Sequence, residues 1–152
     1  MKLKSPFGMS PTGVGPKVYA SAIPFFIIGC LIPSHGSINI ILQSIGLICM
    51  LIGSILFIAT GILLIDNFNA GKLVTTGAFK YSRNPLYSCW ILFIIPGLAL
   101  LCLNWWFILG SVSMYVALNL LIKKEEEMLQ TAFGQEYLDY KKKVGRVFLK
   151  IL

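Results

Sequence analysis

Residues 86–122 read LYSCWILFIIPGLALLCLNWWFILGSVSMYVALNLLI, a stretch without a single Asp, Glu, Lys or Arg. As one helix it would extend about 55 Å at 1.5 Å per residue, whereas the hydrocarbon core of a bilayer is about 30 Å thick. The stretch therefore has to cross twice, and Cys102-Leu103-Asn104 is the place where it can turn. We predict a tight hairpin of two helices, at about 86–102 and 105–122, because lipid-facing backbone must satisfy its own hydrogen bonds.

A second uncharged run, 18–65, is longer still and also has to cross twice. Its break is Pro33-Ser34-His35-Gly36-Ser37, which gives spans at about 16–33 and 38–65. Only 12% of all residues are charged, against about 25% in soluble domains, which excludes an ordinary soluble globule. The expected fold is an all-α integral membrane protein with about four transmembrane helices, forming a single membrane domain over residues 1–152.

Basic residues mark one side of this arrangement, because cytoplasmic loops collect Lys and Arg. Of the thirteen, three precede the first span, three lie between the second and third, and seven follow the fourth. A multi-pass protein with both termini in the cytoplasm places all of them on one face. The net charge of +7 is then explained by anionic membrane lipids, without a nucleic-acid partner, and the lysine run 141–143 is expected to contact lipid headgroups. The oligomeric state cannot be read from this pattern.

Small residues inside the spans predict packing and bends. Gly46, Gly53 and Gly61 are spaced seven and eight apart, which puts them on one side of a helix where a neighbour can approach closely. Pro96-Gly97 is the expected bend of the third span. Beyond the fourth span, Gly134 is expected to stop a helix. A short helical tail on the cytoplasmic side should follow it.

Polar residues concentrate in two stretches on the predicted cytoplasmic face, 73–87 and 123–148. If the hairpin turns near Asn104, Asn84 and Glu125 lie almost equally far from the turn along the chain, one before it and one after it. The two residues should therefore sit at the same depth, and the two stretches should meet.

The two stretches carry charged residues next to predicted helix ends. Pro85 suits the first position of a helix, and Arg83 beside it could hold a carboxylate or phosphate, although Arg83 could also simply mark the membrane border. Glu125-Glu126-Glu127 follow the fourth span, where a helix dipole prefers cations, so either a ligand or a solvated charged face accounts for them. Successive residues point about 100° apart, so one or two of the three can face a pocket. Neither the cysteines nor the single histidine form a pattern that predicts a metal site.

Together the two stretches resemble the isoprenylcysteine carboxyl methyltransferase and phospholipid methyltransferase family. That family shows an approximate pattern G-x-Y-x-x-x-R-H-P-x-Y, a transmembrane hairpin, and then E-E-x-x-L-x-x-x-F-G-x-E-Y-x-x-Y. The matching residues are Gly77, Arg83, Pro85, Tyr87, Glu125, Glu126, Leu129, Phe133, Gly134, Glu136, Tyr137 and Tyr140. The resemblance covers about half of the chain, over 73–148, and the pairing of two motifs across a hairpin makes it specific.

The resemblance implies an enzyme that transfers a methyl group from S-adenosylmethionine, bound at the cytoplasmic face, to a lipophilic acceptor from the bilayer. Methyl transfer needs alignment of the two reactants and exclusion of water. The residues that the resemblance implies are then assigned by role. Arg83 and Asn84 are the expected catalytic residues, with Arg83 and the helix start at Pro85 meeting the donor carboxylate or the acceptor; the donor-binding set is Asn84, Pro85, Tyr87, Glu125, Glu126, Tyr137 and Tyr140.

One departure and two alternatives bear on this prediction. Asn84 stands where the family usually has histidine; it can form hydrogen bonds but cannot be protonated near neutral pH. A rival class is the NADPH-dependent membrane enone and sterol reductases, which have a similar R-x-P-x-Y segment. The other alternative is a non-catalytic membrane protein that retains the fold. The acceptor itself, whether a prenylcysteine carboxylate, a phospholipid or another small hydrophobic molecule, cannot be read from the apolar spans.

Overall fold

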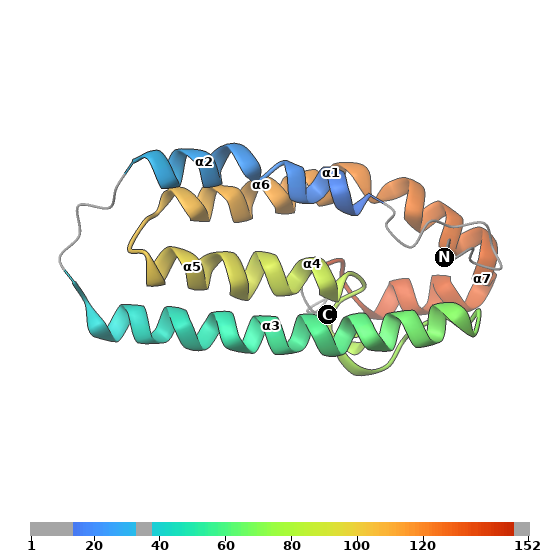
Figure 1. Cartoon of the computed structure of the whole chain (residues 1–152). Coiled ribbons are helices and arrows are strands. Elements are labelled where there is room, and N and C mark those ends of the chain that lie inside the picture. The colour runs from blue at the N-terminus through green and yellow to red at the C-terminus, as the bar shows by residue number, and fades with distance from the viewer. Residues whose placement is uncertain (1–13, 33–37, 148–152) are drawn as a thin grey trace.

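The computed structural model describes residues 14–32 and 38–147, and these residues form helices and connecting turns without a β-strand. The helices lie side by side in an elongated bundle, with α7 at one end (Figure 1). In chain order they are α1 (Gly15–Ala20), α2 (Ile23–Leu31), α3 (Ile40–Asn69), η1 (Gly77–Lys80), α4 (Pro85–Cys89), η2 (Trp90–Ile94), α5 (Ile95–Leu101), α6 (Trp106–Leu121) and α7 (Lys123–Lys143).

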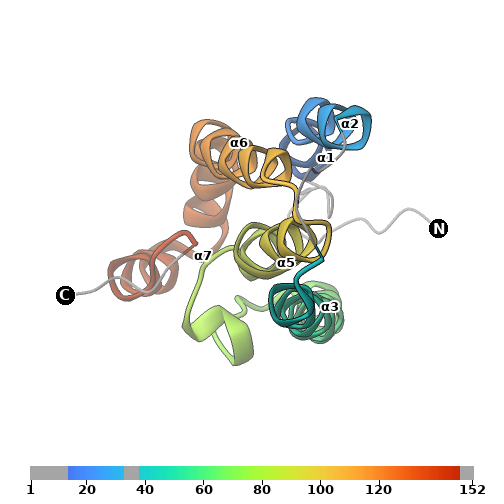
Figure 2. The same ribbon diagram turned by 90° about the vertical axis from the view of Figure 1, so that its left-hand side faces the viewer.

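The continuous helical stretch 85–101, made of α4, η2 and α5, is the centre of the bundle. Viewed from one end, α5 lies between α3 and α6, and α1 and α2 lie beside α6 (Figure 2). The buried core joins these layers, and Ile95, Met114, Leu118 and Val18 are at most 1% exposed. The helices that carry the two polar stretches, α4 and the α6–α7 pair, are therefore fixed to each other through a shared apolar core.

The predicted spans correspond to helices, with two differences in detail. The first span is broken into α1 and α2, because Pro24 falls in the first turn of α2 and cannot continue a helix that reaches it. The second span continues as α3 to Asn69, past its predicted end at Ile65. The predicted break at 33–37 lies outside the described residues.

The predicted tight hairpin between α5 and α6 is confirmed, and Asn104 holds it. Leu103 adopts a φ of 50° in the turn. The buried Asn104 side chain donates from Nδ2 to the carbonyl oxygens of Gly29, at 2.8 Å, and Ile32, at 3.0 Å, and its Oδ1 accepts from the Trp106 amide at 3.1 Å. One amide side chain therefore binds the first amide of α6 and ties the end of α2 to the hairpin.

The glycine face predicted on α3 is confirmed as a close contact with the central helix. A Cβ atom at Gly46 would lie 2.6 Å from the backbone oxygen of Gly97, and one at Gly53 would lie 2.7 Å from the Cβ of Phe93. Only residues without a side chain allow the backbones to approach this closely. Gly61 has more room, since a Cβ there would meet only Leu86, at 4.0 Å.

The glycine face predicts opposite results for two alanine substitutions. Gly46→Ala should destabilise the protein, because the new methyl group would meet backbone atoms that cannot move independently. Gly61→Ala, its matched control on the same helix, should leave stability unchanged or raise it by up to about 1 kcal/mol through helix propensity. Thermal unfolding of the two variants in detergent would measure this, and equal behaviour would contradict the packing described.

The expected bend near Pro96 takes the form of a wider helical turn, η2. The Ile95 amide bonds to the carbonyl of Trp90, five positions earlier, instead of to that of Ile91. The next amide in line for Ile91 belongs to Pro96, which has no N–H to donate. Ser111 of α6 supplies the missing donor, because its Oγ donates to the Ile91 oxygen at 2.6 Å. The proline therefore costs the helix a hydrogen bond that the neighbouring helix replaces.

Removing the Ser111 hydroxyl should reveal how much stability the missing N–H of Pro96 costs. Ser111→Ala leaves the buried Ile91 carbonyl without a donor, so we expect a loss of about 1–3 kcal/mol of stability. Pro96→Ala restores a backbone N–H, and the Ser111→Ala penalty should shrink in that background. A double-mutant cycle in detergent, followed by thermal unfolding, measures the difference; an unchanged penalty would show that Ser111 acts in another way.

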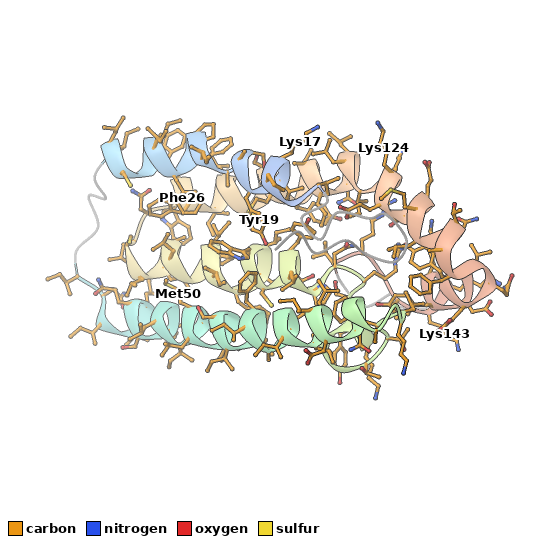
Figure 3. The ribbon with its side chains drawn as sticks, turned by 45° about the vertical axis from the view of Figure 1, so that its right-hand side comes forward. Lys17, Tyr19, Phe26, Met50, Lys124 and Lys143 are labelled. Atoms are coloured by element: carbon orange, nitrogen blue, oxygen red, sulfur yellow. The ribbon has the colours of Figure 1, made fainter. Side chains whose placement is uncertain are left out.

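The outer surface of the bundle is apolar along most of its length. Large aliphatic residues on α3 face outward, including Ile41 at 74% exposure and Ile55 at 66%. Lysines such as Lys124 and Lys143 lie on the outside near α7, whereas Phe26 and Met50 lie between helices (Figure 3). By length and composition α3 can cross a membrane, and the α6–α7 pair, bent by 48°, meets the same criterion when taken together. Four crossings stay a prediction.

Candidate functional site

The two polar stretches meet at one end of the bundle, as the hairpin geometry predicts. We call this the polar end; it comprises residues 77–88 and 119–147. The last described residues, 144–147, form a strap across the start of α4. The amides of Arg83 and Asn84 donate to strap carbonyls, those of Gly145 at 2.8 Å and Arg146 at 3.1 Å. The strap thus occupies two amides of the turn that leads into the helix at Pro85.

Serine and asparagine side chains reinforce the strap. Ser82 Oγ donates to the Arg146 oxygen at 2.8 Å, and Ser88 Oγ lies 3.2 Å from the Val147 oxygen. The two serine hydroxyls are 2.8 Å apart. Asn84 Nδ2 also donates to the Arg146 oxygen, at 3.2 Å. In this arrangement the backbone amide and the side-chain nitrogen of Asn84 both bind the strap.

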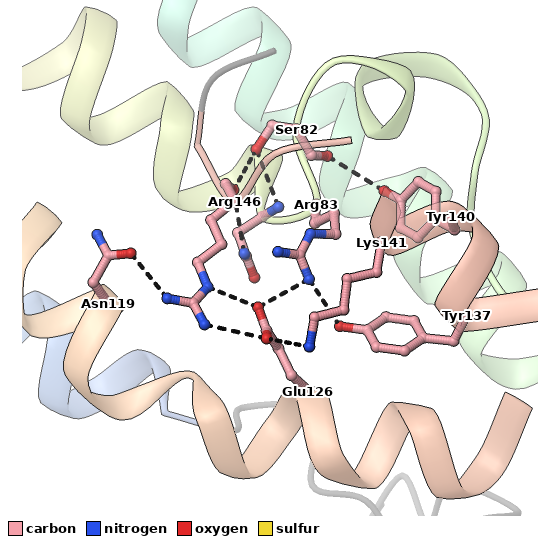
Figure 4. Close-up of polar contacts among 9 residues, drawn as sticks. Ser82, Arg83, Asn119, Glu126, Tyr137, Tyr140, Lys141 and Arg146 are labelled. Atoms are coloured by element: carbon pink, nitrogen blue, oxygen red, sulfur yellow. Dashed lines mark hydrogen bonds and ion pairs between the residues drawn. The ribbon is translucent and has the colours of Figure 1, made fainter. Parts of the chain in front are cut away.

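Glu126 is the charged centre of the polar end (Figure 4). It is 5% exposed and pairs with three cations. Arg83 Nη1 lies 2.9 Å from Oε1, and Lys141 Nζ lies 3.0 Å from Oε2. Arg146 binds in a two-pronged geometry, with Nε 2.8 Å from Oε1 and Nη2 3.2 Å from Oε2. The pairing of Arg83 with Glu126 confirms that residues on either side of the hairpin meet at one depth.

The cations decide the ionisation of Glu126. Burial by itself would raise the pKa of this carboxyl group. The hydrogen bonds from Arg146 and Lys141 and the charge of Arg83 outweigh it, and the pKa falls to about 2. Glu126 is therefore a fixed anion at physiological pH, and both of its oxygens are engaged by cations.

Arg83 is nearly enclosed but is not saturated. Its side chain is 9% exposed. Besides Glu126, Nη1 contacts the Tyr137 hydroxyl at 3.3 Å, whereas the buried Nε atom has no hydrogen-bond partner among the described residues. Three cations face one carboxylate here, so two positive charges are left without a paired anion within the described part of the cluster.

The backbone of α7 brings Tyr137, Tyr140 and Lys141 to this cluster. Gly134 has φ 53° and ψ −124°, a conformation that side chains disfavour, and the helix reverses direction there. The predicted helix stop at Gly134 is thus confirmed. Tyr137 is 2% exposed, and the Tyr140 hydroxyl donates to the Phe79 oxygen at 2.8 Å. The two tyrosines frame Arg83 and the η1 turn.

The adjacent carboxylates point in different directions, and only one of them faces the cations. Glu125 accepts a hydrogen bond from the Val14 amide, at the start of α1. Burial raises the pKa of Glu125, and the Val14 bond only partly offsets this. Tyr87 is on the same side, since its hydroxyl would lie 3.3 Å from a Cβ at Gly15. Glu127 is exposed. The predicted residues therefore divide between a cationic cluster and an α1-facing pair.

Sequence reasoning misses several residues of the polar end. The expected contact of the lysine run 141–143 with lipid headgroups stays a prediction, and the pairing of Lys141 with Glu126 is an additional contact that the sequence did not predict. Arg146 is far from Glu126 along the chain. Nothing in the sequence pattern predicts that the two side chains meet. Arg146 also donates to Asn119 Oδ1 at 3.2 Å. The three adjacent glutamates after the fourth span are the signal in the sequence that cationic partners could come from elsewhere.

The cluster predicts a dependence of stability on pH. Because the folded pKa of Glu126 is about 2, below the ordinary value of 4.5, its stabilising contribution is present above pH 4.5 and is lost as the pH falls from there towards 2. The thermal unfolding temperature of the native protein should therefore fall as the pH is lowered through this window. Glu126→Gln should flatten the drop, whereas the exposed neighbour variant Glu127→Gln should keep the native profile. A native profile in Glu126→Gln would contradict the assignment.

The comparisons with known proteins agree on one family. Residues 37–136 match the family model described as phospholipid methyltransferase. The chain is 32% identical over 120 residues to protein-S-isoprenylcysteine O-methyltransferase of Xenopus laevis, covering 72% of this chain and 42% of that protein. It is 34% identical over 80 residues to the Mus musculus protein of the same name, covering 51% of this chain and 28% of that protein.

A solved structure has the same fold. It is that of a eukaryotic intramembrane Ras methyltransferase, isoprenylcysteine carboxyl methyltransferase, with a TM-score of 0.65 and 25% sequence identity. The match covers 90% of this chain and 53% of that one. The chain thus spans about half, or less, of the length of the relatives that it matches. The family resemblance inferred from the two motifs is confirmed.

Proposed function

The chain belongs to the phospholipid methyltransferase family, and from that premise we propose that it transfers a methyl group from S-adenosylmethionine to a lipophilic acceptor at the membrane surface. S-adenosylmethionine supplies an electrophilic methyl group on a sulfonium, so the reaction needs alignment and exclusion of water more than acid–base chemistry. The polar end, where the helices of the bundle meet a charged cluster, is the proposed site.

The observation that carries this proposal is the excess of positive charge around Glu126. Among the described residues two cations remain unbalanced, and the buried Nε of Arg83 has no partner. A guanidinium whose Nε–H has no partner can bind a carboxylate through two parallel hydrogen bonds. S-adenosylmethionine carries one carboxylate, and Arg83 is the residue that we propose would hold it.

The other predicted residues take different parts in this proposal. Glu126 and Asn84 position Arg83 and the strap, because both Glu126 oxygens pair with cations and Asn84 Nδ2 donates to the Arg146 oxygen. Glu125 and Tyr87, on the α1-facing side, would hydrogen-bond the amino or ribose groups of the donor. Pro85 begins the helix beside them, and Tyr137 and Tyr140 enclose the cluster.

The membrane arrangement belongs to the same proposal. We infer four crossings, formed by α1 with α2, by α3, by α4 to α5, and by α6. The stretches Gly15–Leu31 and Pro85–Leu101 are apolar helices, and a length of about 17 residues is the lower limit for spanning. Both termini and the polar end would face the cytoplasm, since the basic residues gather there. The whole chain would form one membrane domain.

The acceptor is lipophilic on this proposal because large aliphatic side chains cover the outer face of α3, where the bundle would meet the bilayer. The names of the relatives point to prenylated cysteine, and the family model points to phospholipids. A carboxylate or thiolate acceptor would need no base, whereas an ammonium acceptor must first lose a proton. Asn84 cannot accept that proton, because an amide does not titrate near neutral pH.

Binding of labelled S-adenosylmethionine to the purified chain tests this function. We expect saturable binding that NADPH does not displace. Arg83→Gln should weaken it about 10- to 100-fold, the loss that follows from removing a hydrogen bond to a charged group. Lys142→Gln, whose side chain is 75% exposed, is the matched control and should bind as the native protein does.

Thermal unfolding of both variants separates loss of binding from loss of fold. Displacement by NADPH would favour a reductase instead. Absence of binding by either compound to a folded native chain would favour a non-catalytic member of the family.

A further inference from the structure

Trp90 carries a polar atom that the fold does not satisfy. Its indole Nε1 is shielded from solvent and has no hydrogen-bond partner among the described residues. Trp90 opens the wide turn η2, where the helix already departs from regular geometry. A buried N–H without a partner lowers stability, so its presence in a native structure calls for an explanation.

The surroundings of Trp90 are aromatic. The rings of Tyr19, from α1, and Phe57, from α3, meet it edge to face, with centroids 5.6 Å and 6.2 Å away. Such contacts stabilise the rings, but a π face is a weak hydrogen-bond acceptor. Neither ring supplies a hydrogen-bond acceptor to the indole N–H among the described residues.

The aromatic residues connect Trp90 with the polar end. Tyr19 packs against both Trp90 and Tyr87, with a centroid distance of 5.6 Å in each case. Tyr87 belongs to the helix that starts next to Asn84, and Trp90 follows Asn84 by six positions, or about 9 Å along the helix. Figure 3 shows Tyr19 lying between α1 and the central helix. Tyr87, Tyr19 and Trp90 thus form a continuous row of aromatic rings from the polar end into the apolar part of the bundle.

We propose that the Trp90 indole N–H binds an uncharged carbonyl oxygen of the lipophilic methyl acceptor, and so selects acceptors that carry an ester or amide group beside their apolar chain. This inference rests on the proposed function. The oxygen is uncharged because the rings of Tyr19 and Phe57 offer no counter-ion, and burying a lone charge there would be very costly. It belongs to the acceptor because the proposed function already assigns the donor's carboxylate to Arg83 and its amino and ribose groups to Glu125 and Tyr87.

Two matched pairs of compounds test the selection. One pair is N-acetyl-S-farnesylcysteine, which has an amide carbonyl, and S-farnesylthiopropionate, which lacks it. The other pair is a diacyl phosphatidylethanolamine and its dialkyl ether analogue with the same chains. In equilibrium binding to the purified native chain, the carbonyl compound of at least one pair should bind about 10-fold more tightly than its partner. Which pair shows the difference identifies the source of the carbonyl.

Trp90→Phe keeps an aromatic ring and removes the N–H, so it should abolish the preference within the pair, and the two compounds of that pair should then bind equally. Trp106→Phe, at the opposite end of the hairpin, is the matched control and should keep the preference. The stability of Trp90→Phe should equal or exceed that of the native chain, because an unsatisfied donor has been removed.

Two results would overturn the inference. Equal binding of both compounds in both pairs, including no binding at all, would overturn it, and so would a preference that persists in Trp90→Phe. Binding of S-adenosylmethionine, measured in the same preparations, distinguishes the two proposals. If the donor binds and the preference is absent, only the role of Trp90 fails. If the preference is present and the donor does not bind, the methyltransferase proposal fails and a carbonyl-recognising lipid site remains.

Discussion

A buried carboxylate surrounded by cations is the constraint on which the polar end depends. Glu126 sits at the start of α7, and its three partners come from the turn before α4, from the second half of α7 and from the strap. Removing a carboxylate from water is costly unless its oxygens are fully paired. The reversal at Gly134 brings Lys141 back to Glu126, and the path of the strap brings Arg146 to it.

The apolar half of the bundle supports this arrangement through close contacts between its helices. Gly46 and Gly97 allow α3 and α5 to touch backbone to backbone, and Asn104 fastens the hairpin to the end of α2. Ser111 replaces the hydrogen bond that Pro96 removes. These contacts hold the helices side by side, and at the polar end Arg83 lies next to Glu126.

Neighbouring acids with different surroundings give the site two kinds of carboxylate. Burial raises the pKa of Glu125, whereas cations lower that of Glu126. Environments that push the pKa values of two titratable groups apart are typical of functional sites. In our proposal Glu126 organises the protein, and Glu125 and the unsaturated Arg83 face the ligand.

Local rules along the chain are sufficient to predict the helical class, the tight hairpin, the glycine packing face and the meeting of the two motifs, and the motifs in turn indicate the family. The glutamate that faces the cations could not be predicted in this way. Side chains one position apart differ by about 100° around a helix, so the choice between Glu125 and Glu126 depends on how α7 is rotated against α4. Arg146 and Lys141 reach Glu126 because the chain reverses at Gly134 and returns. No short-range pattern encodes the end point of that path, because long-range ion pairs depend on the packing of the whole bundle.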